Sequence, residues 1–303
     1  MKSLSVAIER FKFVVERLFA LYRNRQVEFE YELVVCAIFK NEALYLDEWL
    51  SFHHEIGVDH FYLLNDHSDD DFQTVLEPWI DRKLVKLVNW QGGGQKLAYN
   101  KCIKELRMKA RWIAFIDLDE FLFSPVTKDF KSVLRAYTDV PAIFVYWVLF
   151  GSSGHTDRPK GRVIDSYKCC MDFNAAINDT FDHGKDASMV NYVSGWALDG
   201  KSIVNPRLVR EYNIHMPKSL WAGELVDENR IAPKTKGKGT TLSYSVFRIN
   251  HYWSKSIQDI TEKVNKGSVC NNRRPKRNLA RWLERERQLN VSEDTVILDI
   301  LQR

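Results

Sequence analysis

Apolar segments of strand length alternate with helical segments between residues 31 and 122, and this alternation limits the folds open to the chain. The run 31–39, YELVVCAIF, is continuously apolar and rich in β-branched residues, as expected of a strand buried on both faces. The same pattern predicts further strands at 60–66, 84–90, 111–122 and 141–151, with helices at 40–57, 71–81 and after residue 96. The alternation predicts βαβ units and a mostly parallel α/β sheet in a single compact domain.

Polar side chains follow each of the first four predicted strands. Lys40, Asn41 and Glu42 follow the first strand, and Asp66 opens the polar segment after the second. Asn and Asp also favour helix caps and turns, so any one of these residues has a structural alternative. Because ligands of open α/β sheets bind at the carboxyl ends of the strands, the whole set predicts a site at that edge.

The fourth predicted strand, RWIAFIDLDEFL, carries three carboxylates in an apolar run. Alternate side chains of a strand share a face, so Asp117 and Asp119 are expected to point together, and Leu118 and Glu120 to point the other way. Two hard oxygen ligands on one side suit Mg²⁺ or Mn²⁺. The alternative is a pair of carboxylates in a salt-bridge network, because unpaired buried charge is costly.

Two further segments bear on the site. NHYWSKS places His251 just after a predicted strand, as a third metal ligand, with Lys255 as a point charge for phosphate; His215 is a competing candidate. The glycine-rich segment 91–96, QGGGQK, matches neither GxxxxGK[ST] nor GxGxxG, so we interpret it as a flexible loop.

Composition narrows the class of protein further. A net charge of +4, with 28% charged residues, fits an anionic substrate or membrane surface and does not indicate a nucleic-acid partner. The five cysteines are odd in number, widely spread and form no CxxC pair, which favours a reducing, cytoplasmic compartment. We also find no apolar run long enough to span a bilayer.

Both ends of the chain carry basic segments. Residues 1–25 have apolar residues at helical spacing and six basic against two acidic side chains, so this helix either lies in a membrane interface or packs on the domain. The basic stretch 273–287 has three interpretations: a solvated helix face, a contact for a lipid-linked acceptor, or a surface that binds an anionic membrane. We predict peripheral association with the inner face of a membrane.

These motifs together resemble glycosyltransferase family 92 and family 2-like enzymes with the GT-A fold. The resemblance runs with gaps from about residue 33 to 267 and rests on FKNEALYLDEWLSFHHEIGVDHFYLLNDHSDDD, QKLAYNKCI, RWIAFIDLDEFLF, FGSSGH and INHYWSKS. It implies a Rossmann-like sheet, a nucleotide-diphosphate-sugar donor, a divalent metal and sugar transfer to a hydroxyl. The implied domains are 1–30 (amphipathic helix), 31–270 (nucleotide-binding half 31–125, acceptor half 126–270) and 271–303 (basic helical extension).

The resemblance also assigns roles to residues. Asp117 and Asp119 match its DxD motif, with Glu120 the usual follower, and His251 and Lys255 match its HYxxKS element. Asp117, Asp119 and His251 are then the expected ligands of Mn²⁺ or Mg²⁺. The expected donor-binding residues are Lys40, Asn41, Glu42, Asp66, Asp117 and Lys255, with uridine as the expected nucleoside.

The acceptor side is less defined. The resemblance suggests an inverting route, which needs a carboxylate base, and Glu224 and Asp227 in WAGELVDEN are the candidates, with surface acids as the alternative. The expected acceptor is a glycan or lipid-linked saccharide. A sugar nucleotidyltransferase is the enzymatic rival, but it needs a glycine-rich basic loop after the first strand, and FKNEALY contains no glycine. The non-enzymatic rival is a basic membrane-surface or nucleic-acid adaptor.

Overall fold

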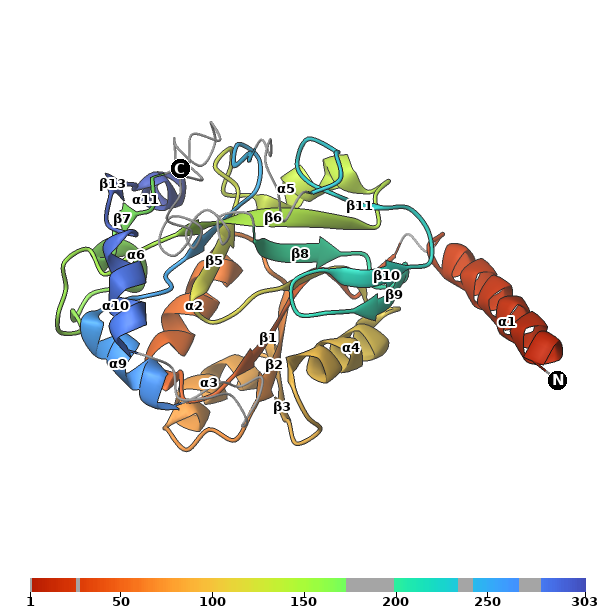
Figure 1. Cartoon of the computed structure of the whole chain (residues 1–303), viewed down its shortest axis with the longest axis horizontal. Coiled ribbons are helices and arrows are strands. Elements are labelled where there is room, and N and C mark those ends of the chain that lie inside the picture. Colours follow the sequence, from red (N-terminus) through yellow and green to blue (C-terminus); the bar gives the residue numbers. More distant parts are fainter. Residues whose placement is uncertain (1, 26–27, 173–198, 234–241, 267–278) are drawn as a thin grey trace.

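A nine-stranded sheet forms the centre of the protein in the computed structural model, which describes residues 2–25, 28–172, 199–233, 242–266 and 279–303 (Figure 1). Its order is β3-β2-β1-β4-β8-β6-β12-β5, and β11 also pairs with β6. The strands are β1 (Tyr31–Phe39), β2 (His60–Asn65), β3 (Val85–Asn89), β4 (Ala110–Phe115), β5 (Glu120–Phe123), β6 (Ala142–Leu149), β8 (Gly200–Val204), β11 (Leu225–Val226) and β12 (Arg248–His251).

The first four strands along the chain pair in parallel, as the alternation of strands and helices predicts. β1 pairs in parallel with β2 and β4, and β2 pairs in parallel with β3. In the other half, β8 runs antiparallel between β4 and β6, while β12 is parallel to β6 and antiparallel to β5. The predicted mostly parallel α/β sheet is therefore confirmed, with β8 and β5 as its antiparallel members.

Helices cover both faces of the parallel half. Alternate residues of β1 belong to two different apolar clusters, one containing Leu33 and Val35 and the other Val34 and Cys36. The first cluster includes side chains of α2 (Ala43–Glu55) and α3 (Phe72–Asp81), and the second includes those of α4 (Gln95–Leu106). Burial on both faces explains why β1 is apolar without interruption.

The remaining elements are shorter and complete the body. The helices are α5 (Phe130–Leu134), η1 (Arg135–Tyr137), α6 (Val163–Ser166), α9 (Ile257–Lys266), α10 (Leu279–Arg287) and α11 (Val296–Leu301). Two small sheets pair β9 (Val209–Tyr212) with β10 (Pro217–Leu220), and β7 (Cys169–Cys170) with β13 (Ser292–Glu293). α10 contacts α9, where Trp282 stacks on Trp253 with ring centroids 4.5 Å apart. The basic residues at 273–277 lie outside the described residues.

The predicted N-terminal helix is α1 (Lys2–Arg23), which extends away from the body (Figure 1). The middle of α1 contacts the body, since the ring centroids of Phe13 and Trp221 lie 5.6 Å apart. Large apolar side chains of α1 remain exposed, including Phe11 at 70% and Leu18 at 61%. Among the described residues, no helix combines the length and apolar character needed to cross a membrane.

Candidate functional site

Chain segments that are distant in sequence meet at one edge of the sheet. β1, β2 and β4 are parallel to one another, and β6 is parallel to β12. β8 lies between β4 and β6 and is antiparallel to both, so all five strands run in the same direction. Their carboxyl ends therefore lie at this edge. The antiparallel strands β8 and β5 begin there. Residues that follow the parallel strands and residues that open the antiparallel ones therefore share a single site.

The predicted strand 111–122 is wrong in one respect, because it is two strands. β4 ends at Phe115, the chain turns at 116–119, and β5 begins at Glu120 and pairs antiparallel with β12. The turn returns Glu120 toward the site, where its Oε2 accepts a hydrogen bond from the backbone N–H of Asp117 at 3.1 Å. The expectation that Glu120 points away from the two aspartates is therefore also wrong, because strand alternation does not apply across a turn.

Asp117 is held by a buried lysine. The Nζ of Lys201, a residue only 1% exposed, lies 2.8 Å from Asp117 Oδ2 and 3.8 Å from Glu120 Oε1. Gln95, at the start of α4, donates a further hydrogen bond to Asp117 Oδ1 at 2.8 Å, and the Tyr99 hydroxyl donates one at 3.2 Å. Burial tends to raise the pKa of Asp117, but the Lys201 ammonium outweighs it and keeps the pKa below its usual value.

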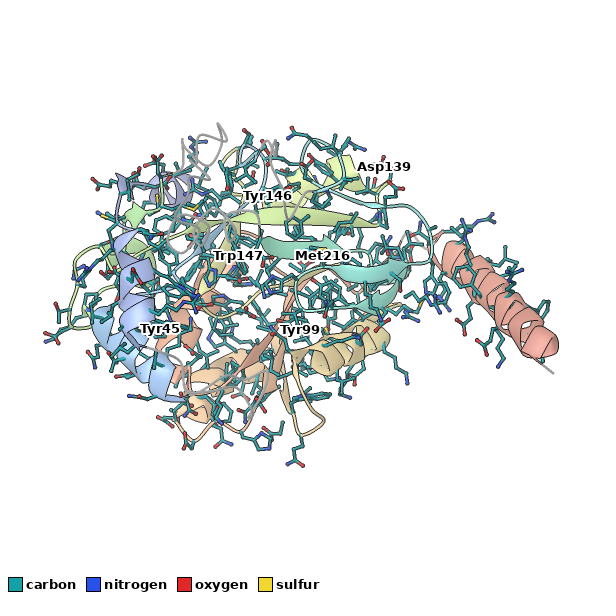
Figure 2. The ribbon with its side chains drawn as sticks, in the orientation of Figure 1. Tyr45, Tyr99, Asp139, Tyr146, Trp147 and Met216 are labelled. Atoms are coloured by element: carbon teal, nitrogen blue, oxygen red, sulfur yellow. The ribbon has the colours of Figure 1, made fainter. Side chains whose placement is uncertain are left out.

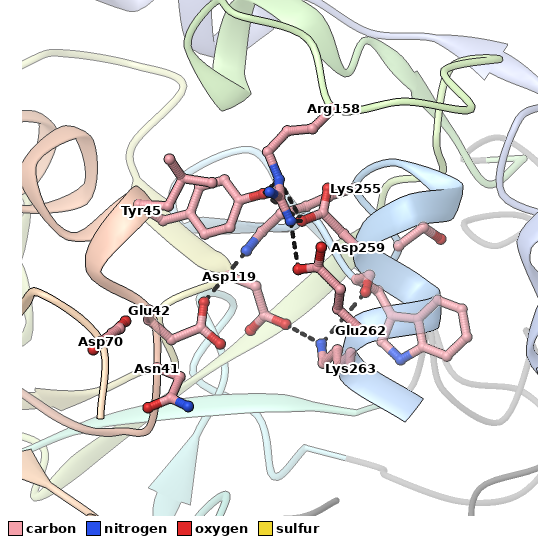
Figure 3. Close-up of a pocket in the computed structure, with 13 residues that line it drawn as sticks. Asn41, Glu42, Tyr45, Asp70, Asp119, Arg158, Lys255, Asp259, Glu262 and Lys263 are labelled. Carbon is pink, nitrogen blue, oxygen red and sulfur yellow. Dashed lines mark hydrogen bonds and ion pairs between the residues drawn. The ribbon is translucent and has the colours of Figure 1, made fainter. Parts of the chain in front are cut away.

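Asp119 lies among cationic groups from the C-terminal part of the chain. Its Oδ2 accepts a hydrogen bond from Lys263 of α9 (Figure 3). Its Oδ1 lies 3.5 Å from His251 Nε2. Burial again acts to raise the pKa, but Lys263 and His251 hold the pKa of Asp119 well below its usual value. Asp119 is therefore an anionic ligand at physiological pH.

Asp119, Glu120 and His251 form a candidate metal centre. Each offers one ligand atom, and these atoms all lie within 4.8 Å of one another. Glu120 Oε1 and His251 Nδ1 are buried and have no hydrogen-bond partner among the described residues. Unsatisfied buried acceptors are costly, and two carboxylates with one imidazole are a donor set that suits Mn²⁺ or Mg²⁺. The structure thus places Glu120 in this cluster, while Asp117 is engaged by Lys201.

A cavity of about 160 Å³ adjoins this cluster (Figure 3). Within it, Lys255 Nζ lies 3.4 Å from the ring centroid of Tyr45 and 3.7 Å from Glu42 Oε2. Arg158 Nη2 lies 2.7 Å from both an Asp259 and a Glu262 carboxylate oxygen. The lining residues are Asn41, Glu42, Leu44, Tyr45, Asp70, Asp119, Arg158, Trp253, Ser254, Lys255, Asp259, Glu262 and Lys263.

The loops after β1 and β2 are joined by hydrogen bonds at the rim of this cavity. Asn41 has a positive φ of 54°, and its Oδ1 accepts a hydrogen bond from the Asp69 backbone N–H at 2.9 Å. Asp70 Oδ2 accepts one from the N–H of Ala43 at 2.7 Å, while its Oδ1 is buried and has no hydrogen-bond partner in the described chain. The predicted donor-binding segment 40–42 is thus brought beside the metal cluster.

Asp66 and Lys40 lie on the same edge but outside the cavity lining. The backbone N–H of Asp66 donates to Phe39 O at 2.8 Å, which places it beside the end of β1. Its carboxylate is 3.0 Å from His67 Nδ1. Lys40 directly follows β1 and is partly exposed.

Glu224 and Asp227 are not brought to this site. β11 pairs with the first residues of β6, Ala142 and Ile143, whereas β12 pairs with its last residues up to Leu149. Glu224 and Asp227 flank β11, and so lie at the opposite end of β6 from His251. The buried Asp227 carboxylate caps a turn by accepting a backbone hydrogen bond from Asn229 at 2.9 Å.

A second imidazole–carboxylate pair lies at this edge, beside the start of β8. His215 Nδ1 is 2.8 Å from Asp199 Oδ1, and both side chains are about one-third exposed. The ring of Trp147, near the end of β6, contacts both His215 and His251, with centroids 5.2 and 4.6 Å apart. His215 is thus a neighbour of the metal cluster and not one of its members.

Sequence patterns missed three of these groups: Lys201, Lys263 and Arg158. Lys201 lies within β8, where the segment GKSIV reads as an ordinary strand with one charge. Lys263 and Arg158 lie in segments that are only brought to the site by tertiary contacts with Asp119 and Asp259. No local pattern marks them.

Comparison with known proteins gives one family across most of the chain. A model of glycosyltransferase family 92 matches residues 31–282. The glycosyltransferase family 92 protein Os08g0121900 of Oryza sativa subsp. japonica is 33% identical over 144 residues, which are 46% of this chain and 25% of that protein. Galactan beta-1,4-galactosyltransferase GALS3 of Arabidopsis thaliana is 27% identical over 136 residues, covering 39% of this chain and 26% of that protein.

The matched segments thus span about a quarter of these relatives. Among solved structures, S. aureus TarS 1–349 superimposes with a TM-score of 0.41 and 12% sequence identity, over 76% of this chain and 62% of that one.

Proposed function

The chain belongs to glycosyltransferase family 92, and we propose that it transfers a sugar from a nucleotide-diphosphate sugar to a hydroxyl of a glycan or lipid-linked saccharide. One observation carries the proposal: the ligand atoms of Asp119, Glu120 and His251 lie within 4.8 Å of one another, beside a cavity whose lining includes three cationic and five acidic side chains. A cluster of metal ligands next to cations suits a metal-bound diphosphate.

In this proposal Asp119, Glu120 and His251 hold Mn²⁺ or Mg²⁺. Glu120 Oε1 and His251 Nδ1 support this set, because both are buried and neither forms a hydrogen bond with a described residue. The departing diphosphate gains negative charge as its bond to the sugar breaks, and the positive charge of the ion would stabilise it. Asp117 takes a supporting part, since Lys201, Gln95 and Tyr99 fix its carboxylate and its backbone N–H fixes Glu120.

The cations of the cavity bind the diphosphate oxygens. Lys255 and Lys263 are paired with Glu42 and Asp119 respectively, and Arg158 pairs with acids of α9 (Figure 3). Lysine acts as a point charge toward phosphate, whereas arginine provides a planar donor fork. The nucleoside, expected to be uridine, lies along the loops after β1 and β2, with Asn41, Asp66 and the unpartnered Oδ1 of Asp70 as its polar contacts.

An inverting reaction agrees with the activity of three similar plant proteins, which are galactan beta-1,4-galactosyltransferases. Sugar nucleotides such as UDP-galactose carry the sugar in α linkage, so forming a β linkage inverts the anomeric carbon. Direct displacement then needs a base on the acceptor side of the sugar.

The test is calorimetric titration of UDP and GDP into the protein with Mn²⁺ and with EDTA. We expect UDP to bind at least tenfold more tightly with Mn²⁺, and Asp119→Asn and Glu120→Gln to remove this dependence. Asp139→Asn is the matched control, since Asp139 lies across the body from the cavity residue Tyr45 (Figure 2). Nucleotide binding that is equal with Mn²⁺ and EDTA, and unchanged by Asp119→Asn, would refute the metal-dependent transferase.

We further propose that α1 binds an anionic membrane surface. Phe11, Leu18 and Phe19 are exposed apolar side chains, and the helix also carries a basic excess. Buried apolar area and attraction to anionic lipid act together in such helices. The cytoplasmic compartment stays a prediction.

Vesicle flotation tests this surface. We expect binding to phosphatidylcholine vesicles containing about 30% phosphatidylserine, weaker binding at high salt, and loss of binding in Leu18→Glu/Phe19→Glu. Ile231→Glu/Val291→Glu places the same charge at apolar residues of the body that are 55% and 60% exposed, and is expected to change nothing. Binding that survives the double substitution would show that α1 is not the membrane contact.

A further inference from the structure

We propose that His215, oriented by Asp199, is the general base that accepts the proton of the acceptor hydroxyl; this rests on the proposed transferase function. The pair lies at the same edge of the sheet as the metal cluster, with Asp199 directly before β8. Its geometry, its hydrogen bonding and the engagement of the described acids of the metal cluster by other partners carry the inference.

The backbone holds both residues in place. The carbonyl of Asp199 accepts a hydrogen bond from the Trp147 N–H at 3.1 Å, which extends the pairing of β8 with β6. The carbonyl of His215 accepts hydrogen bonds from the hydroxyls of Ser202 at 2.9 Å and Tyr212 at 3.2 Å. Two rigid strands and a hairpin loop thus position the imidazole and the carboxylate.

Hydrogen bonding fixes the tautomer of His215. Its Nδ1 lies 2.8 Å from Asp199 Oδ1 and 3.0 Å from the Gly200 carbonyl oxygen. A backbone carbonyl oxygen can only accept a hydrogen bond, and so can the Asp199 carboxylate when it is ionised. Nδ1 of His215 is therefore the nitrogen that carries the proton. The Nε2 lone pair is then available, and no described residue forms a hydrogen bond with it. A carboxylate behind an imidazole is the arrangement that orients a histidine base and stabilises the imidazolium.

Trp147 sets the distance between this base and the metal cluster. One indole ring contacts both imidazoles, at 5.2 Å for His215 and 4.6 Å for His251. The base therefore lies apart from the metal ligands, with the Trp147 ring in contact with both imidazoles. An inverting displacement needs such a separation, because the diphosphate leaves on one side of the sugar and the hydroxyl attacks on the other.

The described acids of the metal cluster are already committed. Lys201 neutralises Asp117, and Lys263 neutralises Asp119. Glu120 is fully buried, and its Oε2 accepts the Asp117 N–H. Among the described residues of the edge near Trp147, the Asp199–His215 pair therefore has the accessible basic atom.

The proposed step conserves atoms and charge. The acceptor O–H gives its proton to His215 Nε2 while its oxygen forms a bond to the anomeric carbon. The bond between that carbon and the diphosphate oxygen breaks, and its electron pair leaves with the nucleoside diphosphate. The imidazolium then pairs with the Asp199 carboxylate, so no further reactant is needed.

The experiment measures UDP release from UDP-galactose, UDP-glucose and UDP-N-acetylglucosamine, alone and with β-1,4-linked galacto-oligosaccharide. We expect His215→Gln to lower kcat about 10²–10⁴-fold while UDP affinity in Mn²⁺ changes less than about twofold, which also reports folding. His215→Gly is expected to regain activity with added imidazole. Asp199→Asn should lower kcat with little effect on KM for the donor, and Asp199→Glu should restore part of it. His54→Gln, an exposed histidine of α2, is the control.

The outcomes separate the two proposals. A His215→Gln protein that binds UDP normally and keeps its kcat would overturn the base assignment and leave the transferase intact. Lost activity in His215→Gly without rescue by imidazole, together with altered UDP affinity, would make the role structural and also overturn it. A wild-type protein that binds UDP with Mn²⁺ but releases none from any of these donors contradicts the transferase itself, and the base assignment falls with it.

Discussion

His53 should make the stability of the fold depend on pH. This histidine of α2 is completely buried; its Nδ1 lies 2.8 Å from the Trp49 carbonyl oxygen, and its Nε2 accepts the N–H of Leu122 at 3.1 Å. One ring nitrogen donates and the other accepts, so the native structure requires the neutral imidazole. Burial lowers the pKa of His53 to about 3, although the hydrogen bond to Trp49 opposes the shift.

The sign of the effect follows from this lowered pKa. In the unfolded chain the imidazole binds a proton below about pH 6.5, whereas in the folded protein it stays neutral down to about pH 3. The free energy of unfolding therefore falls as pH decreases through this window. At pH 5, which is about 1.5 units below the pKa of the imidazole in the unfolded chain, protonation stabilises the unfolded state. The free energy of unfolding is therefore about 2 kcal/mol lower at pH 5 than at pH 8.

The assay is urea unfolding, followed by tryptophan fluorescence, from pH 8 to pH 5. His53→Gln should cost about 1–3 kcal/mol at pH 8, because the Leu122 N–H and the Trp49 carbonyl lose well-placed partners. Its loss of stability toward pH 5 should be about 2 kcal/mol smaller than that of the wild type. His54→Gln, one residue along on the exposed face of α2, should keep the wild-type slope. Equal slopes for wild type and His53→Gln would refute the reasoning.

Three further substitutions test other contacts. Lys263→Met removes the cation that pairs with Asp119. Calorimetry should therefore show tighter Mn²⁺ binding, because the ion no longer competes with Lys263 for Asp119, and about tenfold weaker UDP binding. A fall in both affinities would show that Lys263 does not compete with the metal ion. Gly200→Ala places a β-carbon 2.0 Å from a carbonyl oxygen of β6, so thermal unfolding should show a loss of more than about 2 kcal/mol. Glu228→Gln replaces a carboxylate that accepts hydrogen bonds from the backbone N–H groups of residues 245–247. We expect urea unfolding to show a free energy of unfolding about 1.5–3 kcal/mol lower. An unchanged free energy would show that these hydrogen bonds do not stabilise the segment before β12.

The parallel half of the fold is readable from sequence because its pattern is local. β1 covers the predicted 31–39, and the predicted segments 60–66, 71–81 and 84–90 differ from β2, α3 and β3 by a residue or so at their ends. Each strand there is buried on both faces and each helix on one, so hydrophobic periodicity carries the information. The division of 111–122 into β4 and β5 is not local. Its turn is set by pairing with β12, which lies more than a hundred residues further on.

The same distinction explains what could be predicted of the site. Segment 40–42 directly follows β1, His251 ends β12 and Asp119 lies in the turn after β4, so the order of the strands in the sequence indicates a shared edge. Lys201 reaches Asp117 from 84 positions away, and Lys263 reaches Asp119 from 144. For Glu224 and Asp227 the sequence offers only two carboxylates in a polar segment, and no periodic feature predicts the end of β6 beside which β11 lies.

The charge of the site links its metal and its donor. The three acids of the 117–120 segment are balanced in part by Lys201 and Lys263. A divalent ion arriving alone must compete with Lys263 for Asp119, and a diphosphate arriving alone must approach buried carboxylates. The divalent ion and the diphosphate carry opposite charges of similar size, so their joint binding changes the net charge of the site little. Lys263 then moves from the Asp119 carboxylate to a phosphate oxygen. Binding of each should therefore strengthen binding of the other by the same factor, as linkage requires. A Mn²⁺ affinity that is unchanged by saturating UDP would show that Lys263 does not exchange partners in this way.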